Sequence, residues 1–181
     1  AAPLDIAPRR PTLPRMPDVR PMRASEAATL KRVRLAALRD SPAFFGRPFA
    51  EEAAFEDAVW EKRVASNAAG SETAGFFAER AGAVVGLVVG VDAPDRDAVA
   101  LNALWVAPEA RGLGFGAALV DAVVRWARER GRASVELWVT EGNAGASALY
   151  HRAGFRPTGR VLPHEHMPAL REHEQRLPLG R

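Results

Sequence analysis

The segment Arg111-Gly112-Leu113-Gly114-Phe115-Gly116 constrains this chain more than any other, because three alternate glycines stand between a strand-like run and a helix-like run. Glycine adopts backbone conformations that are closed to residues with a Cβ, so successive amide hydrogens can point toward one position. The helix expected over 116–130 adds unpaired amide donors and the positive end of its dipole beside that position. The segment therefore fits an anion site. A glycine-rich connection without a ligand is the plainer alternative.

Two nucleotide-binding patterns are close to the same segment. Gly112, Gly114 and Ala117 satisfy the dinucleotide pattern G-x-G-x-x-A, and Glu136 follows on the next expected strand at about the required distance. In that pattern the first glycine follows its strand almost directly, whereas residues 107–111 intervene here, so the fit is poor. A Walker A loop is excluded, because it requires a lysine after its last glycine and the sequence has none downstream.

Apolar periodicity divides the rest of the chain into strands and helices. Before residue 75 it predicts an edge strand at 19–22, a helix that Ser25 caps and that ends at 40–42, and a second helix over 51–66. After residue 75 it predicts strands at 76–78, 83–91 and 99–106, the helix 116–130, a strand at 133–139, a helix at 144–152 and a last strand at 174–179. Strands with helices between them indicate a mixed α/β sheet.

Length and composition are those of an ordinary globular protein. The 181 residues are 48% apolar and 26% charged, which predicts one domain with its own core. Residues 1–17 contain five prolines and little apolar periodicity, so we expect a flexible, proline- and arginine-rich tail ahead of a single domain over 18–181. No run of eighteen apolar residues and no signal-peptide core occurs, so neither a membrane span nor secretion is expected.

Several classes of chemistry are disfavoured by residue content. The chain has no cysteine, which excludes disulfides, thiolate-bound metals and a cysteine nucleophile and agrees with a cytoplasmic location. The formal net charge is only +3, and the arginines of the tail lack interleaved aromatics, so we expect no nucleic-acid partner. His164, Glu165 and His166 lack the H-E-x-x-H spacing, so no metal site is predicted and a loop near a substrate mouth is expected there.

Two ordered motifs carry a specific resemblance. The first motif consists of residues 104–108 followed by 111–116, and it resembles the acetyl-coenzyme A motif of the GNAT (GCN5-related N-acetyltransferase) superfamily. The family pattern R/Q-x-x-G-x-G/A falls on Arg111, Gly114 and Gly116. Downstream, residues 143–150 and the pair Gly154-Phe155 match its second signature, N-x-x-A-x-x-L-Y followed by G-F. The resemblance extends from about residue 19 to the end of the chain, and its specific part is 99–155.

The resemblance implies a fold and a set of ligand contacts. The fold would be a mostly antiparallel mixed sheet, splayed at its centre and flanked by helices, with acetyl-coenzyme A as cosubstrate and no metal. The backbone at Trp105 and Val106 would hold the pantetheine arm. The amides of Arg111, Gly112, Leu113, Gly114, Phe115 and Gly116 would bind the pyrophosphate, with the Arg111 side chain closing over it. Asn143 would hydrogen-bond the pantetheine amides.

The resemblance also places Tyr150 near the sulfur, as an acid for the departing thiolate; its usual pKa near 10 suits a group that starts protonated at neutral pH. The alternative is a half-buried helix aromatic with a satisfied hydroxyl. The general base is not assigned, because residues 99–104 contain no acid. Glu136, Glu141 and water relayed through Asn102 are candidates, although both glutamates also fit solvated surface positions.

The resulting hypothesis is an N-acetyltransferase in which a primary amine attacks the thioester directly in a ternary complex. A non-catalytic acetyl-coenzyme A sensor is the second hypothesis, and a dinucleotide-binding oxidoreductase domain is the third. The sequence does not choose the acceptor among small amines, aminoglycosides, amino acids, polyamines and protein amines. A two-fold homodimer is the expectation for assembly on general grounds alone.

Overall fold

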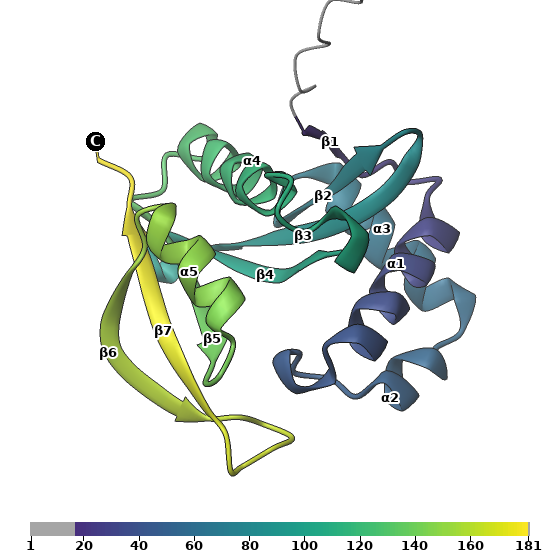
Figure 1. Cartoon of the computed structure of the whole chain (residues 1–181). Helices are drawn as coiled ribbons and strands as arrows, with labels where there is room; N and C mark the ends of the chain where they lie inside the picture. The colour runs from purple at the N-terminus through teal and green to yellow at the C-terminus, as the bar shows by residue number, and fades with distance from the viewer. Residues whose placement is uncertain (1–16, 181) are drawn as a thin grey trace, which may run out of the picture.

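The computed structural model describes residues 17–180, which form one mixed sheet with helices on both of its faces (Figure 1). The strands are β1 (Asp18–Pro21), β2 (Thr73–Arg80), β3 (Ala83–Ala93), β4 (Ala98–Val106), β5 (Ser134–Thr140), β6 (Arg156–Pro163) and β7 (Arg171–Pro178). The α-helices are α1 (Ala27–Asp40), α2 (Phe49–Ala53), α3 (Asp57–Ala69), α4 (Phe115–Glu129) and α5 (Ala144–Arg152). The short 3-10 helices are η1 (Pro42–Phe44), η2 (Pro94–Arg96) and η3 (Pro108–Ala110). The predicted tail, 1–17, lies outside the described residues except for Pro17.

The seven strands follow the order β1-β2-β3-β4-β5-β7-β6, and every neighbouring pair is antiparallel except β4 with β5. Alternate residues of β3 face opposite sides of the sheet. A Cβ on Gly90 would meet Trp126 of α4, whereas Leu87 and Val89 line a cavity with residues of α1 and α3. α4 therefore covers one face, and α1 and α3 cover the other. The predicted mixed, mostly antiparallel sheet is confirmed.

The sheet opens between its two central strands. β4 and β5 are paired only at Ala98–Ala100 with Ser134–Glu136, and beyond these residues the two strands diverge. β4 also carries a bulge, because Leu87 pairs with Trp105 while Val89 pairs with Asn102, so two residues of β4 lie opposite Val88. At this bulge Ala103 has a φ of +56°, which a residue with a Cβ seldom adopts. The predicted central splay is thus present, and the bulge adds a second irregularity beside it.

The structure differs from the sequence predictions in three details outside the glycine segment. Ser25 does not cap α1; Glu26 takes the N-cap position and accepts a hydrogen bond from the Arg23 amide at 2.7 Å. The helix predicted over 51–66 is broken into α2 and α3. The backbone of Glu56 is extended, and this residue is the N-cap of α3. The strand β6 was missed because all of its residues are exposed and it contains two prolines and a glycine, so no apolar alternation marks it.

Among residues 17–180, no helix has both the length and the apolar character needed to cross a membrane. The same part of the chain holds no group of three or more histidine, aspartate or glutamate side chains arranged to bind a metal ion.

Asp92, in β3, ties the far end of α4 to the sheet. Its carboxylate accepts hydrogen bonds from Arg132 Nε at 2.6 Å and from Arg130 Nη2 at 2.7 Å, and these arginine hydrogen bonds lower the pKa of Asp92 far below its usual range. A carboxyl whose pKa is lower in the folded state stabilises the fold above its unfolded pKa of about 3.9, and this contribution is lost as the pH falls toward the folded value.

We therefore expect Asp92→Asn to lower the free energy of unfolding by about 2 kcal/mol at pH 7, since hydrogen bonds to charged groups are of this size. The difference between the variant and the wild type should shrink as the pH is lowered from 5 to 3. Urea unfolding curves at each pH measure it. A difference that stays constant over this range would show that the carboxylate charge is not the cause.

Candidate functional site

The glycine segment forms a tight, exposed loop between β4 and α4. η3 follows β4, and Gly112 and Gly114 then take left-handed φ values of +76° and +87° before α4 begins at Phe115. Gly114 is the N-cap of that helix. The side chain of Leu113 between them is 49% exposed. The loop therefore needs glycine at 112 and 114 for its backbone geometry, as the alternate spacing predicts.

The backbone amides of this loop are available to a ligand. Within the described part of the chain, no carbonyl or side chain accepts a hydrogen bond from the amides of residues 112–117, and the first helical bond of α4 runs from the Ala118 amide to the Gly114 carbonyl at 3.1 Å. Unpaired amides at the start of a helix, together with its dipole, favour an anion. The amides of residues 112–116, which the motif assigns to the pyrophosphate, thus fit that group, whereas the Arg111 amide of the same assignment already donates to the Pro108 carbonyl at 3.3 Å.

The end of β4, the glycine loop and α5 converge at Gly116. A Cβ on Gly116 would lie 3.1 Å from Leu149 Cδ2 and 4.0 Å from Val106 Cγ2, so the absence of a side chain lets α5 approach the first turn of α4. Pro17 lies on the other side of the loop, 3.3 Å from the position of a Cβ on Gly114. The two sequence motifs, about thirty residues apart, therefore meet where the sheet opens.

The side chain of Arg111 points elsewhere than the motif implies. Its Nε donates to the Val106 carbonyl at 3.0 Å, and its Nη2 binds the carboxylate of Asp40. The same carboxylate accepts a hydrogen bond from Trp105 Nε1 at 2.9 Å. Burial raises the pKa of Asp40, but the hydrogen bonds from Ser41, Trp105 and Arg111 outweigh it and leave the pKa below its usual value. In this structure the Arg111 guanidinium thus joins the end of α1 to β4 and does not cover the glycine loop.

Asn143 is the N-cap of α5. Its Oδ1 accepts a hydrogen bond from the Ala146 amide at 3.1 Å, which explains why an asparagine starts this helix. Its Nδ2 has no hydrogen-bond partner in the part of the chain that the structure describes, so the amide group keeps a donor for a ligand. The expected contact with a pantetheine carbonyl is compatible with that geometry.

Tyr150 is buried near the end of α5, with its ring 5.7 Å from the ring of Phe155, centroid to centroid. Its hydroxyl has no hydrogen-bond partner among residues 17–180, yet it is not among the fully enclosed polar atoms that lack one, so the oxygen keeps some access to solvent. Burial raises the pKa of the hydroxyl above its usual value. The side chain is therefore a neutral, unpaired hydrogen-bond donor at physiological pH. No group of the described residues satisfies this hydroxyl, and its assignment to the departing sulfur stays a prediction.

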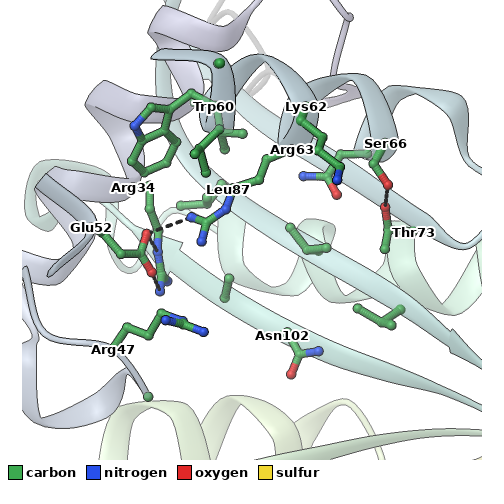
Figure 2. A pocket seen from close by; sticks show the side chains of 18 of the residues that line it. Arg34, Arg47, Glu52, Trp60, Lys62, Arg63, Ser66, Thr73, Leu87 and Asn102 are labelled. Atoms are coloured by element: carbon green, nitrogen blue, oxygen red, sulfur yellow. Dashed lines mark hydrogen bonds and ion pairs between the residues drawn. The ribbon is translucent and has the colours of Figure 1, made fainter. Parts of the chain in front are cut away.

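A cavity of about 1070 Å³ lies on the face of the sheet opposite α4, between helices α1–α3 and strands β3 and β4 (Figure 2). The β4 bulge contributes Asn102 and Ala103 to its wall, and the β6–β7 turn contributes Glu165. The loop around His164, which the sequence places near a substrate mouth, thus lies beside this cavity, and the substrate itself stays a prediction. Sequence reasoning missed the rest of the cavity, because the residues before 75 match the family pattern only in the order of their elements.

The helical side of this cavity carries a buried charge cluster. Glu52 of α2 is 1% exposed, and its carboxylate accepts hydrogen bonds from Arg34 Nη2 at 2.8 Å and Arg63 Nη1 at 3.0 Å. Burial raises the pKa of Glu52, but the two guanidinium groups outweigh it and keep the pKa below its usual value. Because of the break between α2 and α3, Glu52 and Arg63 lie on separate helices, and Glu52 joins Arg34 of α1 to Arg63 of α3.

Of the two candidate bases on the β5 side, Glu136 differs from its expected solvated surroundings and Glu141 does not. Glu136 is buried, not solvated, and its carboxylate binds Arg176 Nε at 2.8 Å and Arg96 Nη2 at 2.8 Å. This carboxylate is committed to two guanidinium groups and is not free to contact a substrate. Glu141 is exposed and immediately follows β5. Asn102 is exposed to the cavity at the bulge, which leaves the water-mediated route open.

His164 has a structural function in the β6–β7 turn. It is buried, and its Nδ1 accepts hydrogen bonds from the amides of His166 at 3.2 Å and Met167 at 3.1 Å. The ring therefore holds the backbone of the turn through Nδ1. The histidine cluster of the sequence is therefore a turn that shapes the cavity mouth.

Sequence comparison finds relatives over parts of the chain. An uncharacterized N-acetyltransferase from Methanocaldococcus jannaschii is 42% identical over 60 residues, which are 33% of this chain and 26% of that protein. A mycothiol acetyltransferase from Stackebrandtia nassauensis is 54% identical over 52 residues, which are 29% of this chain and 17% of that protein. The chain thus spans well under a third of the length of these two curated relatives.

Structural comparison extends the likeness to the whole fold. A solved structure of yncA, a putative acetyltransferase from Salmonella typhimurium with its cofactor acetyl-CoA, superposes with a TM-score of 0.74 at 18% identity, covering 91% of this chain and 95% of that one. At this identity the likeness establishes the fold. A sequence model of the acetyltransferase (GNAT) family matches residues 34–155, which is more than half of the chain and includes both motifs. With this match and the splayed sheet, the chain belongs to the GNAT family of acetyltransferases.

Proposed function

We propose that this protein is an acetyl-coenzyme A-dependent N-acetyltransferase that transfers the acetyl group directly to a primary amine. One observation carries the proposal: the amides of residues 112–117, which have no hydrogen-bond acceptor among residues 17–180, lie beside the opening between β4 and β5, where Val106 and Leu149 approach Gly116. An anion-binding loop at the mouth of a split sheet is suited to a ligand that has a diphosphate and a long, amide-bearing arm.

Different residues at the opening would bind different parts of acetyl-coenzyme A. The amides of 112–117 would hold the pyrophosphate, and the free edge of β4 beyond Ala100 would pair with the pantetheine arm as an added strand would. Asn143 Nδ2 would donate to the same arm from the start of α5. Bound acetyl-coenzyme A would supply the reactive thioester. Arg111 would reach its phosphates only by leaving Asp40 and the Val106 carbonyl.

The cavity on the α1–α3 side would receive the acceptor. Its wall includes Asn102 and Ala103 of β4, the strand along which the pantetheine arm would lie, so an amine in the cavity would approach the thioester from that wall. Asn102 would orient the amine or a water that takes its proton. Tyr150 would donate its hydroxyl proton in a hydrogen bond to the departing sulfur, because burial keeps that hydroxyl neutral.

Ligand binding and thiol release test the proposal. Acetyl-coenzyme A at about 100 times its Kd should stabilise the fold by about 2.7 kcal/mol, which corresponds to several degrees in the melting temperature, and NAD at the same concentration should have no effect. Release of free coenzyme A should then require an amine, with no acetyl group left on the protein when the amine is omitted.

The outcomes separate the competing hypotheses. Stabilisation without thiol release for any amine would identify a sensor. An acetylated protein that forms without acceptor would exclude direct transfer. Stabilisation by NAD alone would indicate the dinucleotide-binding alternative.

A further inference from the structure

We infer that the acceptor is a small amine that also carries a carboxylate, which three arginines of the cavity recognise. This inference rests on the proposed function and names the substrate class of the same site. The three residues, called the arginine wall below, are Arg34 of α1, Arg47 of the α1–α2 connection and Arg63 of α3. Figure 2 shows them on the helical side of the cavity, with Asn102 on the strand opposite.

The charge around the cavity is unbalanced. Among the described residues that line it, four are basic and two are acidic; the basic ones are the arginine wall and Lys62, and the acidic ones are Glu52 and Glu165. Glu165 lies at the mouth with its side chain 79% exposed, so solvent screens much of its charge. The interior of the cavity is therefore a positively charged environment with Glu52 as its main counter-charge.

Glu52 does not neutralise the arginine wall. Its single carboxylate is shared between Arg34 and Arg63, which leaves that cluster with a net positive charge. Arg47 binds Glu51, four residues along the chain, in a solvent-exposed pair that contributes little. A carboxylate from a ligand would balance the excess charge. Guanidinium groups suit this role because they remain charged and bind carboxylate oxygens in pairs.

The remaining walls set the shape of the ligand. Leu87, Val89 and Val91 form an apolar surface along β3, and the volume of about 1070 Å³ is that of a site for a small molecule. A carboxylate at the arginine wall would leave the amine free to reach Asn102 and Ala103 at the bulge. An amino acid with an apolar side chain has these three parts. Polyamines and aminoglycosides, which are polycations, would be repelled by the same charge.

A matched pair of acceptors tests the inference. L-leucine and L-leucinamide have the same side chain and amine, and only leucine has a carboxylate. The carboxylate raises the pKa of the neighbouring ammonium, so leucinamide is the more reactive amine in solution. We expect the protein to reverse this order, with kcat/KM from coenzyme A release at least 10-fold higher for leucine, and to acetylate spermidine still more slowly.

Substitution of Arg47 localises the effect. Arg47 is 53% exposed, so Arg47→Gln should fold normally, raise KM for leucine about 10-fold, leave KM for acetyl-coenzyme A unchanged and remove most of the preference over leucinamide. Arg39→Gln is the matched control, because Arg39 packs on Phe49 and does not line the cavity. It should behave as the wild type does.

Two results overturn the inference while the proposed function survives: equal or better turnover of leucinamide or spermidine, or an Arg47→Gln variant that keeps the full preference for leucine. If no amine of the panel is acetylated, the proposed function fails and the inference fails with it.

Discussion

Replacing Tyr150 with phenylalanine is expected to lower kcat by roughly 10²-fold, the lower end of the range for a positioned proton donor. The affinity for acetyl-coenzyme A should not change, because the assigned hydrogen bond forms as the sulfur departs and not when the thioester binds. Rates measured at saturating acceptor, together with the Kd of acetyl-coenzyme A, separate the two effects. A loss of affinity equal to the loss of kcat would instead assign Tyr150 to binding.

Tyr150→Phe should change the chemistry of the side chain without changing the fold. The hydroxyl donates to no partner among residues 17–180, so its removal should leave the free energy of unfolding nearly unchanged, and the ring should keep its contact with Phe155. Burial raises the pKa of the hydroxyl above its usual value of about 10, so the wild-type kcat should not fall through loss of this proton up to pH 10. An unchanged kcat in the variant would remove Tyr150 from the mechanism.

The second large effect is expected from Gly114→Val, which should raise the Kd of acetyl-coenzyme A by at least about 100-fold and abolish its thermal stabilisation. Gly114 has a φ of +87°, a conformation that a β-branched residue avoids, and its new Cβ would also lie within 3.3 Å of Pro17. The loop would have to change its backbone to accept valine. The amides of 112–117 would then lose the arrangement that we propose for binding the diphosphate.

A control must separate this local effect from general destabilisation. Gly131, just past the other end of α4, has a φ of +69° and open space where a Cβ would lie. Gly131→Val should carry a similar conformational strain of about 1–2 kcal/mol, with a lower melting temperature, but it should keep full stabilisation by acetyl-coenzyme A. If Gly114→Val is stabilised as strongly as the Gly131→Val control, the glycine loop does not hold the diphosphate.

The parts of the fold that follow local rules could be predicted from the sequence. The loop glycines, α4, α5 and β4 were placed to within one residue, because left-handed φ values, helical spacing and strand alternation depend on neighbours in the chain. The two motifs also predicted the split sheet through their resemblance to a family. By contrast, the exposed strand β6 has no local signal. It exists because β7 offers it an edge to pair with.

In the candidate site, the loop backbone could be predicted from the sequence, whereas the side-chain contacts could not. Nothing near Arg111 indicates that its guanidinium binds Asp40, a residue 71 positions earlier, and nothing near Glu136 indicates its two arginine partners. The cavity that we propose for the acceptor combines residues from α1–α3 with the β4 bulge and the β6–β7 turn, so no single segment reveals it.

By itself, the sequence determined the backbone of the glycine loop at 111–116 and the family to which the chain belongs, because both depend on residue types at fixed short spacings. Only the tertiary structure decided which charges are neutralised. An ion pair or a cavity forms between side chains that are distant in sequence, and the packing of α1, α2 and α3 against the sheet sets their distances. That packing gave the cavity its excess of positive charge, whereas the pairing of β5 with β7 and the position of η2 committed Glu136 to two arginines.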